Sequence, residues 1–138
     1  MNIGLKDKRI LSDVRMDKAR EFLSDARANF AEKRYRTAIN RAYYASLSAL
    51  RAVLILEGIN PETHDGVLTM LSIRFIKTGV IPVQIMKNFK SLFSRRTDVD
   101  YGDFDATSSD DAEDALKNAG ELIDAVDAAR MKMLEEIK

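Results

Sequence analysis

The chain has no cysteine, no tryptophan, only two prolines and a single histidine among its 138 residues. Without cysteine it has no disulfide framework, no thiol nucleophile and no cysteine-ligated zinc, a usage that fits a reducing cytoplasm. One histidine excludes a histidine pair at metal-binding spacing, and the chain contains neither a glycine-rich phosphate loop nor a Gly-x-Ser-x-Gly turn. We therefore predict no metal and no cofactor.

The chain also lacks a net charge and a long apolar run. Lys+Arg and Asp+Glu both number 22, so no global field attracts nucleic acid or anionic lipid, and any polyanion site must be local. The longest apolar stretch is Ala52–Leu56, far below the roughly 20 residues that span a bilayer. Charged residues at 6–9 occupy the place where a signal peptide becomes apolar. We expect a cytoplasmic protein without membrane contact.

Helical periodicity dominates the rest of the chain. Apolar residues recur at steps of three and four in five segments, which predicts helices over residues 12–32, 35–57, 65–77, about 82–96 and 110–136. The second segment is apolar nearly all round and belongs in the middle of the fold. Residues 1–11 are predicted to be a flexible arm and 98–109 a loop. The predicted fold class is all-α: an antiparallel up-and-down bundle of about five helices, in one domain spanning 1–138.

Polar groups interrupt the apolar second helix at Asn40, Arg41, Tyr43 and Tyr44. Burying such groups costs several kcal/mol, on the order of 2 to 7, unless they are hydrogen-bonded. Either they pack in the core, with Arg41 paired to an acidic neighbour, or they line a cleft. Aromatic residues at helical spacing more often fill core volume, so core packing is the favoured interpretation.

His64 stands beside Asp65 in a turn ahead of the third predicted helix. It is either a capping or surface residue, or a general acid or base, because it is the only side chain with an unperturbed pKa near neutrality.

The segment 95–103 brings together Arg95, Arg96, Asp98, Asp100 and Asp103 at the expected exit of the fourth helix. Two guanidinium groups suit phosphate recognition, because each presents a planar fork of donors. The aspartates can orient these forks or neutralise them. The alternative is a helix-terminal Arg/Asp network that needs no ligand.

Three separated segments together resemble the HEPN family: Tyr35–Ala45 on the central helix, Thr63–Val67, and Arg96 with Asp100–Gly102. The likeness covers roughly residues 12–135. It implies an antiparallel helical bundle that dimerises, with a cleft where the arginine motifs of both protomers meet. Many relatives are toxins that cleave RNA without metal, or are encoded beside a minimal nucleotidyltransferase that acts as antitoxin.

The family's catalytic signature is an arginine followed, after four to six residues, by a histidine. Counting from Arg95 or from Arg96 leads to Tyr101 instead. A phenol with a reference pKa of about 10 is a poor base near neutral pH. Cleavage would therefore require that His64 reach the cleft or that Tyr101 be activated.

The resemblance predicts a homodimer that pairs with a nucleotidyltransferase-type partner and binds nucleotide or RNA phosphate in an intersubunit Arg/Tyr cleft. The expected binding residues are Arg95, Arg96, Asp100, Tyr101, Asn40, Arg41 and Tyr44. The catalytic candidates are Arg96, Tyr101 and His64. Two alternatives stay open: an active metal-independent RNase toxin, and a structural scaffold without a ligand. Tyr101 is also a candidate acceptor for a nucleotidyl group.

Overall fold

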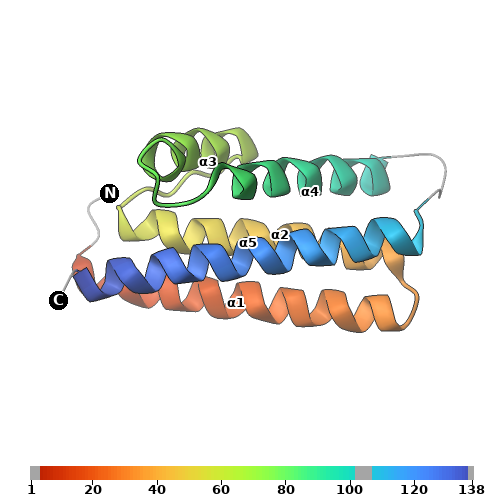
Figure 1. Cartoon of the computed structure of the whole chain (residues 1–138). Helices are drawn as coiled ribbons and strands as arrows, with labels where there is room; N and C mark the ends of the chain where they lie inside the picture. The colour runs from red at the N-terminus through yellow and green to blue at the C-terminus, as the bar shows by residue number, and fades with distance from the viewer. Residues whose placement is uncertain (1–3, 102–106, 137–138) are drawn as a thin grey trace.

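The computed structural model describes residues 4–101 and 107–136, and all regular structure in these ranges is helical. The elements follow in the order α1 (Leu5–Ala31), α2 (Tyr35–Leu56), α3 (His64–Leu71), the π-helical turn η1 (Ser72–Ile76), α4 (Val83–Tyr101) and α5 (Ser109–Glu136). Figure 1 shows α1 and α2 running antiparallel, α5 beside them, and α3 with α4 forming the opposite layer. The prediction of an all-α bundle is confirmed. Across the described ranges, no helix is both long and apolar enough to span a bilayer.

Helix α2 is the centre of the bundle, as its all-round apolar pattern predicted. It contacts α1, α3, α4 and α5. One of its stripes consists of small residues that are completely buried: Ala38, Ala42, Ala45, Ala49 and Ala52. Small side chains let neighbouring backbones approach closely, while Ile39, Leu50 and Leu54 fill the volume on the adjacent stripe. The helix that carries Tyr43 and Tyr44 is thus fixed from several sides.

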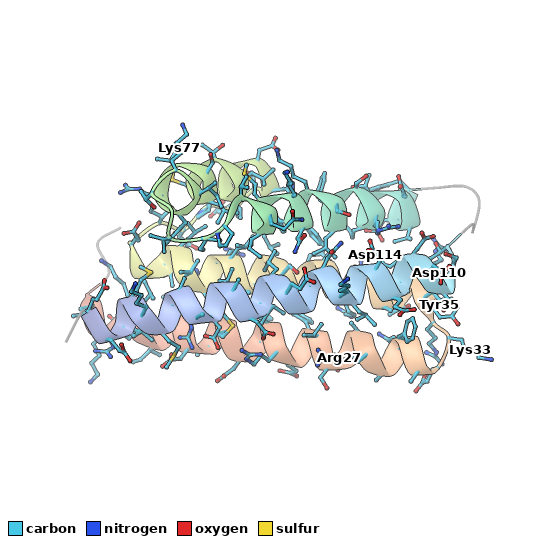
Figure 2. All side chains as sticks on the ribbon, viewed as in Figure 1. Arg27, Lys33, Tyr35, Lys77, Asp110 and Asp114 are labelled. Carbon is cyan, nitrogen blue, oxygen red and sulfur yellow. The ribbon has the colours of Figure 1, made fainter. Side chains whose placement is uncertain are left out.

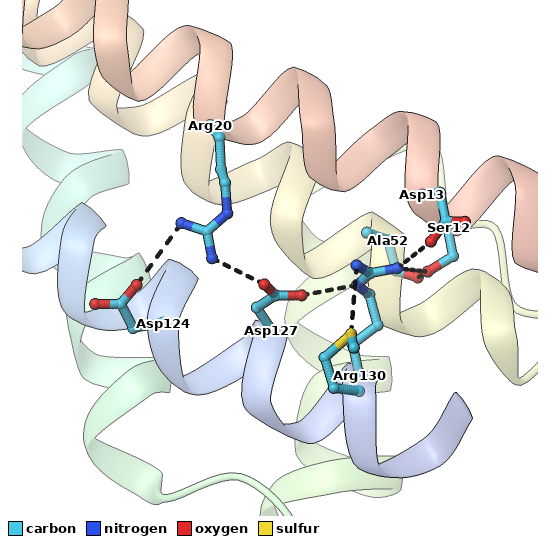
Figure 3. Close-up of polar contacts among 8 residues, drawn as sticks. Ser12, Asp13, Arg20, Ala52, Asp124, Asp127 and Arg130 are labelled. Carbon is cyan, nitrogen blue, oxygen red and sulfur yellow. Dashed lines mark hydrogen bonds and ion pairs between the residues drawn. The ribbon is translucent and has the colours of Figure 1, made fainter. Parts of the chain in front are cut away.

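A polar network that the sequence did not predict joins α1, α2 and α5 (Figure 3). Ser12 Oγ donates to the Ala52 carbonyl oxygen at 2.7 Å. The buried Arg130 guanidinium donates to Asp13 at 2.7 Å and to Asp127 at 2.9 Å. Each buried donor thereby has an acceptor, which burial in an apolar bundle requires. The network fixes how α5 lies against α1.

The first helix begins at Leu5 rather than at residue 12, so the predicted flexible arm is wrong for residues 5–11. The apolar pattern missed these turns because Leu5 and Ile10 are 47% and 51% exposed and do not continue the buried stripe. Lysine, arginine and leucine are good helix formers, and no proline or glycine interrupts them. Helix propensity therefore extends α1 towards the N-terminus, ahead of the first residue that is buried in the bundle.

Helix α4 continues to Tyr101, so the predicted loop is wrong for residues 98–101, and Arg96 lies within the helix rather than at its exit. Two interactions explain the extension. Val99 is buried, and the Arg36 guanidinium donates to its carbonyl oxygen, which satisfies a free acceptor at the helix end. Arg96 also pairs with Asp100 one turn later. The remainder of the predicted loop up to residue 106, including Asp103, lies outside the described residues.

Candidate functional site

Arg96 lies against three aromatic rings on the side of α4 that faces α2. Its guanidinium carbon is 4.8 Å from the ring centroid of Tyr43, 5.8 Å from that of Tyr44 and 5.4 Å from that of Phe93. A cation over an aromatic face gains about 0.5 to 2 kcal/mol, more when it is shielded from water. We call these four residues, together with His64, the Arg96 cluster. The rings hold the charge in a defined place.

The polar contacts of Arg96 leave part of its donor capacity unused. One terminal nitrogen pairs with Asp100 at 3.2 Å, and the other carboxylate oxygen of Asp100 is 3.5 Å from the Asn40 amide nitrogen. The Nε of Arg96 is buried and has no hydrogen-bond partner among the described residues. The Nε of Arg95 is in the same state. A buried donor of this kind costs free energy unless water or a ligand supplies the acceptor.

His64 reaches the cluster because it is the first residue of α3. The preceding Thr63 caps the helix, accepting a hydrogen bond from the Gly66 amide at 2.9 Å. The imidazole stacks on Phe93 with a centroid distance of 3.7 Å and an interplanar angle of 19°. Its Nδ1 is 3.1 Å from the Tyr43 hydroxyl oxygen. The cap is thus Thr63 and not His64, which was considered as a capping or surface residue and instead packs inward.

The surroundings of His64 favour a neutral imidazole. Burial lowers its pKa most; Asp65 acts in the opposite direction, and the positive charge of Arg96 lowers the pKa further. The pKa of Tyr43 is raised, chiefly by burial, so its phenol stays protonated. At neutral pH the cluster therefore combines one fixed cation with an uncharged imidazole. The Nε2 of that imidazole has no partner within the described chain.

Arg95 lies on another side of α4. Its terminal nitrogens pair with Asp111 and Asp114 of α5, both at 2.9 Å. Figure 2 labels Asp114 where α5 faces the C-terminal half of α4. Of the Arg/Asp network considered from the sequence, the Arg96–Asp100 pair is present, whereas Arg95 takes its partners from α5. The two adjacent arginines do not share one environment.

The other predicted site residues outside the rings lie in three different places. Asn40 and Asp100 join Arg36, Thr37 and Val99 in an open groove of about 480 Å³ between the start of α2 and the end of α4. Arg41 points toward α1, where its guanidinium carbon is 5.7 Å from the Phe22 ring centroid. Tyr101 ends α4 and is 76% exposed, with no contact to the cluster among the described residues. The structure therefore brings Asn40, Tyr44, His64, Arg96 and Asp100 together.

The sequence reasoning missed Phe93 and Tyr43 as parts of the site. Both were assigned to packing, and both do pack, but their rings also carry His64 and Arg96. No local pattern signals this double use. The prediction that the Arg41 guanidinium pairs with an acidic neighbour is not met in the described ranges, because an aromatic ring takes that place. Those ranges also contain no cluster of three potential metal ligands.

The architecture defines an all-helical bundle domain with an arginine, aromatic rings and a histidine gathered where α2, α3 and α4 meet. The HEPN domain family model matches residues 12–131. The chain belongs to the HEPN family.

Two of its relatives match over most of their length. A UPF0332 protein of Thermotoga maritima is 31% identical over 121 residues, covering 88% of this chain and 89% of that protein. A Methanocaldococcus jannaschii protein named a "putative toxin" is 30% identical over 129 residues, covering 94% and 96%. The crystal structure of TT1696 from Thermus thermophilus superimposes with a TM-score of 0.74, over 86% of this chain and 97% of that one. At 21% identity it supports the shared fold alone.

Proposed function

We propose that this HEPN domain is the homodimeric component of a toxin–antitoxin-type pair, and that it binds the phosphate of RNA or nucleotide at the Arg96 cluster. The observation that carries the proposal is the Arg96 guanidinium, which three rings hold in place while its buried Nε has no described partner. The name of the M. jannaschii relative supports the toxin assignment. We also propose that the protein acts in the cytoplasm, where such a ligand is present.

The arrangement of Arg96 suits an anion that carries several acceptor oxygens. A guanidinium can donate to two oxygens of one phosphate, and a preorganised guanidinium loses little entropy on binding. Asp100 occupies one side of the fork, so the ligand takes the remaining donors. Asn40 and Tyr44 lie next to this position and contribute an amide and a ring face. We assign Arg95 the task of holding α4 against α5, because both its terminal nitrogens are engaged.

Binding can be tested by fluorescence anisotropy with a short labelled oligouridine and by calorimetry with ATP. Arg96→Gln keeps much of the size of the side chain and removes its charge, and we expect about tenfold weaker binding of both ligands. Lys77→Gln is the matched control, because it removes one exposed positive charge from the edge of the molecule opposite α1 (Figure 2). Equal affinities for the two variants would contradict the proposal.

The homodimer and the partner have their own measurements. Sedimentation velocity should show a species of about twice the 15.6 kDa of the chain, and a monomer at all concentrations contradicts the dimer.

The partner that we propose is a minimal nucleotidyltransferase, and the exposed Tyr101 is its candidate substrate. In that reaction the phenolic oxygen attacks the α-phosphorus of ATP, the phenol proton passes to solvent, and pyrophosphate leaves. Mass spectrometry after incubation with the partner and ATP should detect the adduct. If Tyr101 stays unmodified when it is incubated with an active partner and ATP, this modification is contradicted.

A second function, metal-independent RNA cleavage, is favoured by the position of His64 on Phe93. A neutral imidazole can take the proton of a 2′-hydroxyl, and Arg96 can stabilise the charge that develops on the phosphorus oxygens. We expect cleavage to persist with a chelator and to fall about 10²- to 10⁴-fold in His64→Gln. If wild type, His64→Gln and Arg96→Gln cleave at equal rates, neither residue takes part. The absence of cleavage in wild type leaves phosphate binding as the function.

A further inference from the structure

A second cationic site lies between α1 and α2 and shares Tyr44 with the Arg96 cluster. Its volume is about 270 Å³, and its lining includes Arg15, Lys18 and Phe22 of α1 with Tyr44, Ser48 and Arg51 of α2. This volume is close to the lower end of small-ligand sites, which begin at roughly 300 Å³. We call it the Arg51 pocket. Three of its seven lining residues carry a positive charge.

The charges of the Arg51 pocket are not neutralised within the described chain. Arg15, Lys18 and Arg51 form no ion pair with any described carboxylate. The Nε of Arg51 is buried without a hydrogen-bond partner. Three arginines elsewhere in the molecule each pair with two carboxylates: Arg20, Arg95 and Arg130. The pocket therefore gathers three positive charges that no described carboxylate pairs with, in a chain whose formal net charge is zero.

Hydrogen bonds tie the two helices together at the pocket, and the Arg51 guanidinium donates from a terminal nitrogen to Asn60 Oδ1 at 3.4 Å. Arg15 donates from a terminal nitrogen to the Arg51 carbonyl oxygen at 3.3 Å, and Ser48 Oγ donates to the Arg15 carbonyl oxygen at 2.8 Å. Burial lowers the pKa of Arg15 most, and the charge of Arg51 lowers it further. Like charges held together in a partly buried place are unfavourable, and an anion between them relieves that repulsion.

Tyr44 connects the Arg51 pocket with the Arg96 cluster. Its side chain lines the pocket, and its ring centroid is 5.8 Å from the Arg96 guanidinium carbon. Phe22 adds a second ring in the pocket, with the Lys18 ammonium 5.7 Å from its centroid. Cations that alternate with aromatic rings are the pattern by which proteins bind single-stranded nucleic acid: the cations take phosphates and the rings stack on bases.

We propose that the Arg51 pocket is a second phosphate subsite, which binds one phosphate of a single-stranded RNA while a neighbouring phosphate of the same strand lies at Arg96. Arg15 and Arg51 hold the phosphate from two sides, Lys18 adds a third charge, and the base between the two phosphates stacks on Tyr44. The identity of the ligand as RNA rests on the proposed function. The anion site itself rests on the charges of Arg15, Lys18 and Arg51 and does not involve Arg96.

The test measures anisotropy of the same labelled oligouridine over a series of salt concentrations. Arg51→Gln should weaken binding about tenfold. It should also lower the slope of log K against log salt by about 0.7, the value for one lost phosphate contact on a single strand. Arg51→Lys keeps the charge and should keep the slope, and Lys77→Gln should change neither quantity. Arg15→Gln is a second variant that removes charge from the α1 side, and circular dichroism verifies that each variant is folded.

The outcomes separate the two proposals. If Arg51→Gln and Arg15→Gln bind RNA like Lys77→Gln while Arg96→Gln binds weakly, the Arg51 pocket is not a subsite and the proposed function stands. If the Arg51 pocket variants bind weakly and Arg96→Gln binds normally, the subsite stands and the Arg96 assignment fails. A wild-type protein that does not bind RNA contradicts both. Adenosine monophosphate that binds as tightly as the oligonucleotide identifies a mononucleotide site and overturns the RNA assignment.

Discussion

His64 and Arg96 lie against the same aromatic ring, that of Phe93. The ring centroid is 3.7 Å from that of the imidazole and 5.4 Å from the guanidinium carbon, although the histidine begins α3 and the arginine belongs to α4. The resemblance led us to expect a histidine four to six residues after the arginine, where this sequence has Tyr101. Tertiary packing thus brings an imidazole to the arginine from a different helix.

The first prediction separates the two adjacent arginines. Arg95→Gln removes two partly exposed ion pairs between α4 and α5, so the free energy of unfolding should fall by about 1 kcal/mol, while RNA affinity stays close to wild type. Arg96→Gln should weaken RNA binding about tenfold, and it should also lower the free energy of unfolding, because its contacts with three rings and its pair with Asp100 are lost. Urea unfolding and RNA anisotropy on both variants measure the two quantities. A weak-binding Arg95→Gln of unchanged stability would instead make Arg95 the residue that contacts phosphate.

The helices could largely be predicted from the sequence, because burial of an apolar stripe leaves a periodic trace. This periodic pattern did not predict helical segments that are exposed or that depend on a contact with another helix. The first turns of α1 are helical without being buried, and the last turn of α4 depends on the Arg36 guanidinium from α2. A contact between residues distant in sequence has no local pattern, so the predicted fourth helix ended at about residue 96.

The candidate site was predictable only in part, for the same reason. Asn40, Asp100 and Arg96 were expected at one site and do lie together. The partners of Arg95 were not predictable, because several nearby aspartates had the same chemistry and the bundle geometry selects those of α5. The position of His64 depends on how the turn before α3 folds back onto α4.

The second prediction concerns pH. The folded pKa of His64 lies below its unfolded value, so the unfolded chain binds more protons as the pH falls below about 6.5. The free energy of unfolding should therefore decrease between neutral pH and the folded pKa of His64. His64→Phe keeps an aromatic ring against Phe93 and should lose this dependence. Urea unfolding across that range measures the slope. Parallel curves for wild type and variant would show that His64 is not buried as described.

The third prediction tests how His64 is positioned. Thr63→Ala removes the hydroxyl that accepts from the Gly66 amide, which should cost about 1 kcal/mol of stability. If the cap also orients His64, the imidazole resonances should move toward those of a solvent-exposed histidine, with a higher pKa. Thr63→Ser keeps the acceptor and should preserve both properties. NMR titration of the single histidine gives the measurement. An unchanged histidine pKa in Thr63→Ala would mean that packing on Phe93 alone fixes the ring.

The fourth prediction concerns Arg130, which is 7% exposed and donates to Asp13 and Asp127. Arg130→Met keeps much of the buried aliphatic length and loses the donors, so the free energy of unfolding should fall by about 2 kcal/mol. Asp13→Asn should cost much less, because the Asp13 side chain is 62% exposed and water replaces its contact.

The same network predicts an acid-dependent difference for Arg130→Met. Burial raises the pKa of Asp127, but hydrogen bonds from Arg20 and Arg130 outweigh burial and leave that pKa below its usual value. The stabilisation is therefore present above the unfolded pKa of about 3.9 and disappears as the pH falls through the folded one. Arg130→Met should reduce this acid-sensitive part, so its deficit relative to wild type should shrink at low pH. A deficit that is constant between about pH 6 and pH 3 would assign the loss to packing of the arginine stem rather than to its charge.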